Sequence, residues 1–413
     1  MNKRSTSALS RSTSALSDDS STALNPPVKP IEIDTAAGSW LHRLSCRYLL
    51  SPATGAPSVF KTWIAAVAST YLPLFVAARW SSLPIASRTA EVSLPFLYDW
   101  NVAFMFLVTF PVLLSLTLRD QSVLASSLTR VQADGVLIIP DRKAASLGAE
   151  WKSRFRKINR AARVIGLSLG AFLAWSNYHT YICLPFWIAR HGKLLPVGFV
   201  YLWCIFLFYV LVPVYILRNI GISYLLKDVV AHAQISELPF HPDQSGGLRP
   251  VGEIGLRNQY GLTVVGVNIV ILGFLYPLYL HITSGVAGLI AAAGIAYVIF
   301  GPLVFIGPLL PFRAGMLRTK TELMSEVAQR LRVELHRLRQ QLQSGDIKKE
   351  DEEMIDRLRK LGSVIDQLPV WPFDFGTLRK FLSAYVTPLL GAALAALAKP
   401  ETILSALGRL FKH

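Results

Sequence analysis

The residues best suited to chemistry lie in one string, LPFHPDQSGGLRPVGEIG at positions 238–255. His241 and Asp243 together could bind a cation or transfer a proton, because imidazole nitrogens and carboxylate oxygens do both. The alternative is structural: Asp243 caps the glycine-rich turn, and His241 bonds to the backbone. The candidate functional loop comprises His241, Pro242, Asp243, Gly246 and Gly247.

Metal, cofactor and enzyme signatures are weak or missing. His232 lies nine residues before His241, a wider spacing with fewer ligands than known zinc sites have. The chain lacks the motifs GxxxxGKS/T and HExxH, which argues against a nucleotide-driven motor and a zinc protease. We therefore predict no metal and no cofactor, and an enzyme is the less favoured class with its catalytic residues unknown.

Polar side chains inside apolar stretches form a second group of candidates. Asn177 and His179 lie in the string SNYHTY, and Asn268 is the strongly polar residue of a later stretch. Polar residues at membrane depth usually face protein or water, so these three are candidate cavity-lining residues, and His179 could sense pH. The alternative is hydrogen bonding between neighbouring helices.

The string GPLVFIGPLLP at 301–311 holds two Gly-Pro pairs that should interrupt a helix. A break here could act as a hinge, and the alternative is a static kink. The candidate hinge residues are Gly301, Pro302, Gly307 and Pro308.

Six apolar stretches must position all these residues. Each has about 17–25 residues, enough to cross roughly 30 Å of hydrocarbon at 1.5 Å per residue. A mean hydropathy of +0.41 with 16% charged residues also argues against a soluble protein. No stretch carries a charged residue near its centre, which weighs against ion-coupled carriers. The predicted spans of this membrane domain, 37–311, are about 60–78, 97–118, 164–187, 196–217, 261–281 and 285–311.

The distribution of positive charge predicts the threading. With the N-terminus in the cytoplasm, 35 of the 42 Lys and Arg residues lie on the cytoplasmic side. The opposite side holds Arg79, Arg88, Arg190 and Lys193. The net charge of +16 then reflects topology and contact with anionic lipid, and no nucleic acid partner is predicted.

After the sixth span the pattern changes to amphipathic helices. Residues 314–343 repeat apolar positions every seven residues, and 347–367 form a second apolar face after a turn at 344–346. We expect a coiled-coil-like cytoplasmic hairpin, 312–370, that supports a homo-oligomer. The first helix places Leu317, Met324, Leu331 and Leu338 in one seam with Ala328, Leu335 and Leu342; the second uses Met354, Ile355, Leu358, Leu361 and Ile365.

The two ends of the chain differ from the rest. Residues 1–36 are rich in Ser and Thr, repeat RSTSALS in tandem, and should form a disordered cytoplasmic tail. In the C-terminal region, 371–413, Thr377 can cap a helix through 381–398. That helix is either a seventh span or, slightly favoured by the charge rule, an interfacial or re-entrant helix. The overall prediction is an all-α polytopic bundle of six spans, or seven.

Two strings resemble sequences of uncharacterised bacterial multipass membrane proteins. HPDxxGGL after an even-numbered span is similar to a cytoplasmic loop motif of those proteins, and WPFDFGTLRKFL at 371–382 is similar to their C-terminal region. The resemblance implies a multipass fold in a bacterial inner or plasma membrane, and it implies no activity.

Three function classes remain open. The first is a channel-like or sensor and signalling protein whose cytoplasmic helices act on the spans, and the uncharged spans and heptad seam favour it. The second is a membrane scaffold that binds a cytoplasmic protein partner without transport. The third is a membrane-embedded enzyme or lipid-handling protein that uses His241 and Asp243.

Overall fold

The computed structural model describes residues 34–50, 56–81, 85–87, 92–182, 186–190, 192–236, 243, 245–279, 284–344 and 349–398. Nearly all of this part is helical, so the all-α fold class is confirmed. His241, Pro242 and the chain after residue 398 lie outside the described residues. Most of the expected tail does too, but its last residues are ordered, and Thr35 and Ala36 are buried.

The helices follow one another with short connections. In chain order they are α1 (Trp40–Tyr48), α2 (Val59–Ser69), α3 (Tyr71–Trp80), the 3₁₀ turn η1 (Phe96–Tyr98), α4 (Trp100–Phe104), the π turn η2 (Met105–Thr109), α5 (Phe110–Ala133), α6 (Asp141–Tyr181), α7 (Pro196–His232), α8 (Arg249–Tyr279), α9 (Ser284–Ile306), α10 (Leu310–Ser344), α11 (Lys349–Asp366) and α12 (Phe375–Ala398). Two antiparallel strand pairs join connecting segments: β1 (Leu137–Ile138) with β4 (Gln234–Ile235), and β2 (Ala189–Arg190) with β3 (Lys193–Leu194).

Three helical segments are long and apolar enough to cross a membrane, and a bent pair makes a fourth, among the described residues. They are Val59–Trp80, Trp100–Ala133, Pro196–His232, and Ile290–Ile306 with Leu310–Gln340. This is compatible with a membrane protein, and it supports fewer crossings than the six predicted. Several predicted spans are the apolar parts of longer helices, because backbone hydrogen bonds continue a helix whatever the polarity of its side chains.

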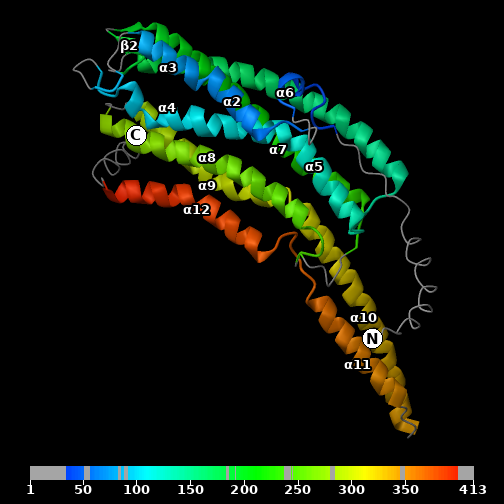
Figure 1. Ribbon diagram of the computed structural model, residues 1–413. Coiled ribbons are helices and arrows are strands. Elements are labelled where there is room, and N and C mark those ends of the chain that lie inside the picture. The colour runs from blue at the N-terminus through cyan, green and yellow to red at the C-terminus, as the bar shows by residue number, and fades with distance from the viewer. Residues whose placement is uncertain are drawn as a thin grey trace, which may run out of the picture.

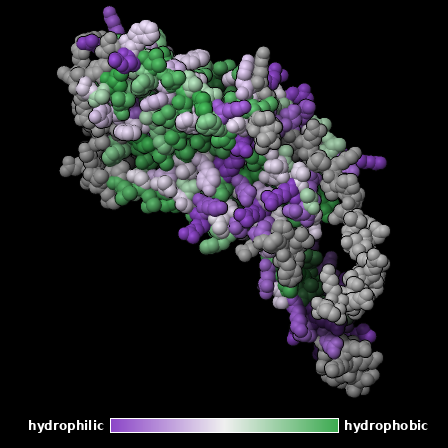
Figure 2. Space-filling model, viewed as in Figure 1, coloured by the Kyte–Doolittle hydropathy of each residue, from purple (hydrophilic) through white to green (hydrophobic). Residues whose placement is uncertain are grey.

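The long helices lie side by side in a bundle, and α10 and α11 leave it as a narrow arm (Figure 1). We call the end of the bundle nearest the arm the arm-side end, and the end around η1 and β2–β3 the far end. Helices α6 and α7 pack closely because α6 presents glycines: a Cβ on Gly166 would lie 2.8 Å from the carbonyl oxygen of Val210, and Gly170 faces Phe206. Apolar side chains gather on the bundle and hydrophilic ones on the arm (Figure 2).

Large apolar side chains are exposed on the outside of the bundle. A soluble protein rarely leaves such an extended apolar surface uncovered. Examples from five helices are Phe60 and Trp63 on α2, Phe172 and Trp175 on α6, Phe199 and Trp203 on α7, Ile299 and Phe300 on α9, and Leu390 and Leu394 on α12.

The arm is a helical hairpin in which α11 packs back on α10. Its small core contains Val327, Ile365 and Leu368. The predicted seam is partly wrong: Leu335 is 44% exposed, and buried Val327 takes the place expected for Ala328. A seven-residue repeat is satisfied by either neighbour of a position, and only the partner helix decides which neighbour faces it. On α11, Ile355, Leu358 and Ile365 are buried, whereas Met354 and Leu361 are exposed.

Helix α12 lies along α8 and α9 and not beneath the bundle (Figure 1). The ring centroids of Phe381 and Phe305 are 4.1 Å apart, and those of Tyr385 and Tyr297 are 5.8 Å apart. The Thr263 hydroxyl on α8 donates to the carbonyl oxygen of Ala384 at 3.1 Å. Asp374, not Thr377, caps this helix, since its carboxylate accepts from the backbone N–H of Thr377 at 2.9 Å.

Candidate functional site

The turn before α8 is held together by Asp243. Its Oδ1 accepts from the backbone N–H groups of Ser245 at 3.0 Å and Gly247 at 2.9 Å, and its Oδ2 from that of Arg249 at 3.2 Å. Gly246 and Gly247 have φ of 63° and 85°, a left-handed conformation that favours glycine. The loop therefore has the geometry expected if Asp243 has a structural role and caps the glycine-rich turn.

This environment makes Asp243 a poor base. Partial burial raises the pKa of its carboxyl group, but the hydrogen bonds from the backbone of Gly247 and Ser245 outweigh burial and lower it to about 2. The carboxylate is thus ionised at neutral pH and fully engaged by backbone donors. A partnership with His241 stays a prediction, because His241 lies outside the described residues.

The glycines of this loop allow close packing at the base of the arm. A Cβ on Gly252 would lie 2.6 Å from the carbonyl oxygen of Pro372, and one on Gly255 would lie 2.8 Å from that of Phe305. Gly246 faces the ring of Pro369. The start of α8, just after the HPDxxGGL string, is therefore in contact with the string at 371–382.

A pocket of about 520 Å³ opens beside this loop. It lies between the end of α5 and the start of α8, and its lining carries both signs of charge. Arg249 pairs with Glu253 at 3.3 Å. Its lining residues are Arg130, Asp134, Asp243, Gly247, Arg249, Pro250 and Glu253.

A second polar site lies deeper, in the arm-side half of the bundle, where charged side chains of α5, α7 and α8 meet. The Nη1 of Arg257 donates to Asp120 Oδ1 at 2.9 Å, and its Nη2 donates to the carbonyl oxygen of Leu116. The Nε of Arg218 lies 3.4 Å from Asp120 Oδ2, an ion-pair distance without hydrogen-bond geometry. The side chains of Arg218 and Asp120 are 0% and 1% exposed.

This ion cluster, Asp120, Arg218 and Arg257, is unevenly satisfied. Asp120 is engaged by both cations, but none of the three guanidinium nitrogens of Arg218 has a hydrogen-bond partner among the described residues. Burying an ion costs several kcal/mol unless partners offset the loss of water. Side-chain atoms of Asn219 on α7 and of Asn258 and Gln259 on α8 are also buried without partners in the described part of the chain.

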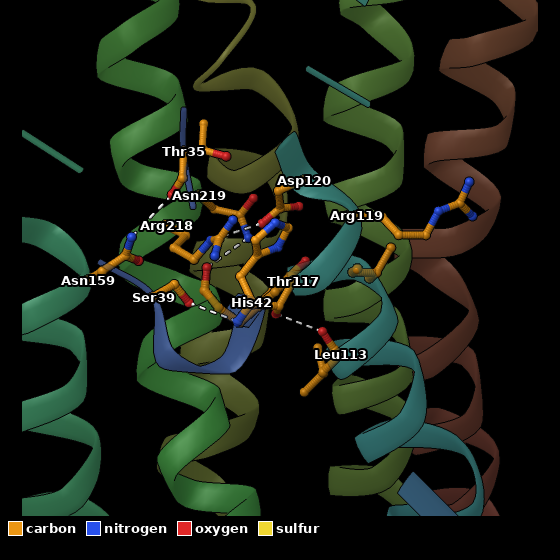
Figure 3. A network of polar contacts seen from close by, with 12 residues as sticks. Thr35, Ser39, His42, Leu113, Thr117, Arg119, Asp120, Asn159, Arg218 and Asn219 are labelled. Carbon is orange, nitrogen blue, oxygen red and sulfur yellow. Dashed lines mark hydrogen bonds and ion pairs between the residues drawn. The ribbon is translucent and has the colours of Figure 1, made fainter. Parts of the chain in front are cut away.

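The N-terminal segment 34–48 covers Asp120 and Arg218 of the ion cluster (Figure 3). Asn159 on α6 donates to the carbonyl oxygens of Thr35 at 3.1 Å and Ala37 at 2.9 Å, and Arg163 donates to that of Gly38 at 2.9 Å. Gly38 has φ of 73°, which lets the segment turn into α1. Hydrogen bonds to α6 thus fix the cover in place.

His42 on α1 lies beside Arg218 and Asp120 (Figure 3). Burial is the main cause that lowers the pKa of His42, and the positive charge of Arg218 lowers it further. Its Nδ1 is buried without a hydrogen-bond partner among the described residues. His42 is therefore held neutral against the cationic cluster.

The far end of the bundle holds a different buried carboxylate. Asp99 is 0% exposed and caps α4 through Val102 N–H at 3.1 Å, and its other oxygen accepts from the indole N–H of Trp187 at 3.1 Å. The surrounding rings include Phe96 and Tyr201, both packed on Trp187. Both oxygens of Asp99 thus have a neutral donor.

The predicted cavity-lining residues are placed without forming one cluster. Asn177 donates to the carbonyl oxygen of Leu173 in its own helix at 2.7 Å, and His179 is exposed between the rings of Trp175 and Tyr178. Asn268 lies on α8, with its Oδ1 buried and unpaired among the described residues.

The two Gly-Pro pairs differ in effect. Gly301 and Pro302 lie inside α9, where the Tyr385 ring covers Gly301. The helix breaks at the second pair, Gly307 and Pro308, and α10 leaves at 44°. The structure thus has one break here, and whether it moves stays a prediction.

Sequence reasoning missed the ion cluster because of where the predicted spans ended. Asp120 and Arg218 lie just past the predicted ends at 118 and 217, so they counted as loop residues that set the topology. The available signal was local: apolar residues continue on both sides of Arg218, as Ile216 and Ile220 show. A charged residue flanked in this way is often buried in a continuing helix.

Comparison with known proteins adds no assignment. No family model matches this chain, and no curated protein or solved structure matches it. The resemblance to bacterial multipass proteins stays a prediction.

Proposed function

We propose that this chain is a multipass membrane protein of the sensor or signalling type, in which the arm acts on the spans. The observation that supports it is the continuous path from α9 through the 44° break into α10. Because only the short break at 307–309 separates α10 of the arm from α9 of the bundle, a displacement of the hairpin is passed directly to α9.

Contacts at the base of the arm support this coupling. The Thr319 hydroxyl donates to the carbonyl oxygen of Ile235 at 3.3 Å, which joins α10 to the segment after α7. The guanidinium of Arg313 lies 4.5 Å from the ring centroid of Trp371, close to the start of α12. Rotation of α10 would therefore displace the ends of both neighbouring elements.

The proposed topology has six crossings and a cytoplasmic N-terminus and arm, with α12 as a seventh crossing. The six crossings are α2 with α3, α4 with α5, α6, α7, α8 and α9. The packing of α12 along α8 and α9, and the exposed Leu390 and Leu394, support the seventh. A reporter fused after residue 190 should read as outside and one after 345 as inside; the reverse result would contradict this threading.

Partners follow from the same proposal: anionic lipid at the basic surfaces, and further copies of the chain through the arm. The native mass of the detergent-solubilised protein checks the second. A closed ring of four or more subunits would favour the channel-like version of this class, and a monomer would remove oligomerisation from the proposal.

The alternative in which Asp243 acts in an enzyme is less well supported by the geometry. Its carboxylate already accepts three backbone N–H groups, and the low pKa leaves little affinity for a proton.

Disruption of the arm core tests the coupling. A spin label at Ile299, an exposed position of α9, reports motion of the bundle in a chain whose native cysteines are replaced. Val327→Asp should unfold the hairpin and change the label's spectrum, because Val327 is 8% exposed in the arm core. Val333→Asp is the matched control, since Val333 is 60% exposed on the same helix.

The outcomes distinguish an arm that moves the bundle from an arm that is only attached to it. A changed spectrum for Val327→Asp with an unchanged one for Val333→Asp supports the proposal. If circular dichroism shows a melted hairpin while the Ile299 label is unaffected, the arm is a passive appendage and the proposal is wrong.

A further inference from the structure

The ion cluster carries a surplus of positive charge. Arg218 and Arg257 share one carboxylate, Asp120, so the three side chains have a formal net charge of +1. Arg257 takes the better position, with one hydrogen bond to Asp120 and one to the carbonyl oxygen of Leu116. Arg218 retains an ion pair at 3.4 Å and no hydrogen bond among the described residues.

Burial without hydrogen-bond partners raises the free energy of the Arg218 guanidinium. Arginine presents five N–H donors in a rigid planar fork, and all the nitrogens of Arg218 are buried. Pairing with one carboxylate that already serves a second arginine does not satisfy them. A group with several acceptor atoms and a negative charge would satisfy both the donors and the excess charge.

One further unpaired donor lies on α8, where that helix contacts α7. The amide nitrogen of Asn258 is buried and unpaired within the described part of the chain. The Tyr215 hydroxyl donates to the carbonyl oxygen of Asn258 at 2.8 Å, which fixes that residue on α8 beside α7. Amide N–H groups complement an anion without adding charge.

The N-terminal segment 34–48 covers this site. Segment 34–48 lies over Arg218 and Asp120 (Figure 3). Hydrogen bonds from Asn159 and Arg163 on α6 hold it there. The neutral side chain of His42 on this cover adds no charge that could compensate Arg218. The acidic residue of the segment, Asp34, pairs with Lys152 at 3.7 Å.

We propose that Arg218, with Arg257 and the amide of Asn258, binds a small inorganic anion beneath segment 34–48. The guanidinium fork favours oxyanions of the size of phosphate over a spherical ion, because two parallel N–H groups match two oxygens. The site does not depend on motion of the arm, so it stands apart from the proposed function.

Thermal unfolding of the full chain in detergent tests the site, with inorganic phosphate as the probe. Sodium gluconate, whose anion is too bulky for an enclosed site, keeps the ionic strength constant, and chloride serves as a second probe. A ligand that binds only the folded protein raises the melting temperature in a saturable way. We expect this for phosphate, with a weaker effect for chloride.

Substitutions in the ion cluster should change phosphate affinity in opposite directions. Arg218→Gln should weaken phosphate binding at least tenfold, and Arg218→Lys, which keeps the charge and loses the fork, should weaken it less. Asp120→Asn raises the net charge of the cluster and should tighten binding several-fold. Arg318→Gln is the control that leaves affinity unchanged, since Arg318 is exposed on the arm and pairs with Glu322.

Three results would overturn the proposal. One is a wild-type melting temperature that does not depend on either anion. Another is an Arg218→Gln protein with the wild-type response, which would make Arg218 a purely internal ion-pair partner. If Arg218→Gln does not fold, equal affinities for wild type, Arg218→Lys and Asp120→Asn would show that the anion binds elsewhere.

Discussion

Two buried carboxylates in this molecule have opposite surroundings. Asp99, at the far end, accepts from one backbone N–H and one indole N–H, and aromatic rings enclose it. Asp120, in the arm-side half, faces two arginines, one of which lacks hydrogen bonds to the described residues. The difference teaches that burial alone does not mark a functional charge. Asp99 is satisfied by two neutral donors, whereas Asp120 offsets only one of the two positive charges of Arg218 and Arg257.

Removal of the Asp120 carboxylate should have the largest effect on stability. Asp120→Ala leaves two cations without their counter-ion, and breaking a buried pair in this way costs about 3–5 kcal/mol. Unfolding by heat or denaturant in detergent without phosphate measures the loss. A change below about 1 kcal/mol would mean that water reaches the cluster and screens it.

The contact between Gly252 and Pro372 at the base of the arm should also be sensitive to an added methyl group. Gly252→Ala places a methyl group 2.6 Å from the carbonyl oxygen of Pro372, and such overpacking costs about 1–3 kcal/mol. Gly294→Ala in α9 is the matched control: among the described residues, no atom outside the adjoining turns of α9 lies within 4 Å of the added methyl, so higher helix propensity should stabilise by up to about 1 kcal/mol. Equal effects for both would show that the junction is loosely packed.

Asp99→Asn sharpens the comparison directly. The variant loses one acceptor and leaves either Trp187 or Val102 without its partner, which costs about 1–2 kcal/mol. This loss should be the same with and without phosphate, whereas phosphate should partly reverse the loss caused by Asp120→Asn. A phosphate-dependent effect of Asp99→Asn would remove the distinction between the two carboxylates.

The smallest expected effect concerns Asp243 and depends on pH. Its folded pKa of about 2 lies below the ordinary aspartate value of about 3.9, so its contribution to stability is present above pH 4. That contribution, about 1 kcal/mol because the group is partly exposed to solvent, should disappear as pH falls from about 4 to 2. The difference in unfolding midpoint between wild type and Asp243→Asn should shrink over this range, and a constant difference would contradict the capping role.

Several features could be predicted from local sequence because their causes are local. Helix-forming apolar runs gave the all-α class, and heptad spacing indicated two amphipathic helices before 367. The glycine pair after Asp243 signalled a left-handed turn. In the arm, however, the choice between Val327 and Ala328 depended on where α11 lies, and a single-helix pattern does not contain that information.

The ion cluster shows more clearly what the sequence pattern could not predict. Apolar periodicity identified stretches that end at 118 and 217, and the charges beyond them were interpreted as topology signals. The helices continue, and Asp120, Arg218 and Arg257 meet although they come from three different helices. Nothing in the spacing of the three residues along the chain predicts that meeting, because it depends on the register between packed helices.

The sequence by itself determined the apolar helices, the charge asymmetry and the glycine-rich turn, since propensity, hydropathy and backbone freedom act within a few residues. Only the tertiary structure decided that one buried aspartate is satisfied and the other is outnumbered by arginines. The physical reason is that the free energy of a buried charge depends on which groups surround it in space, and neighbours in space are set by packing of helices far apart in the chain.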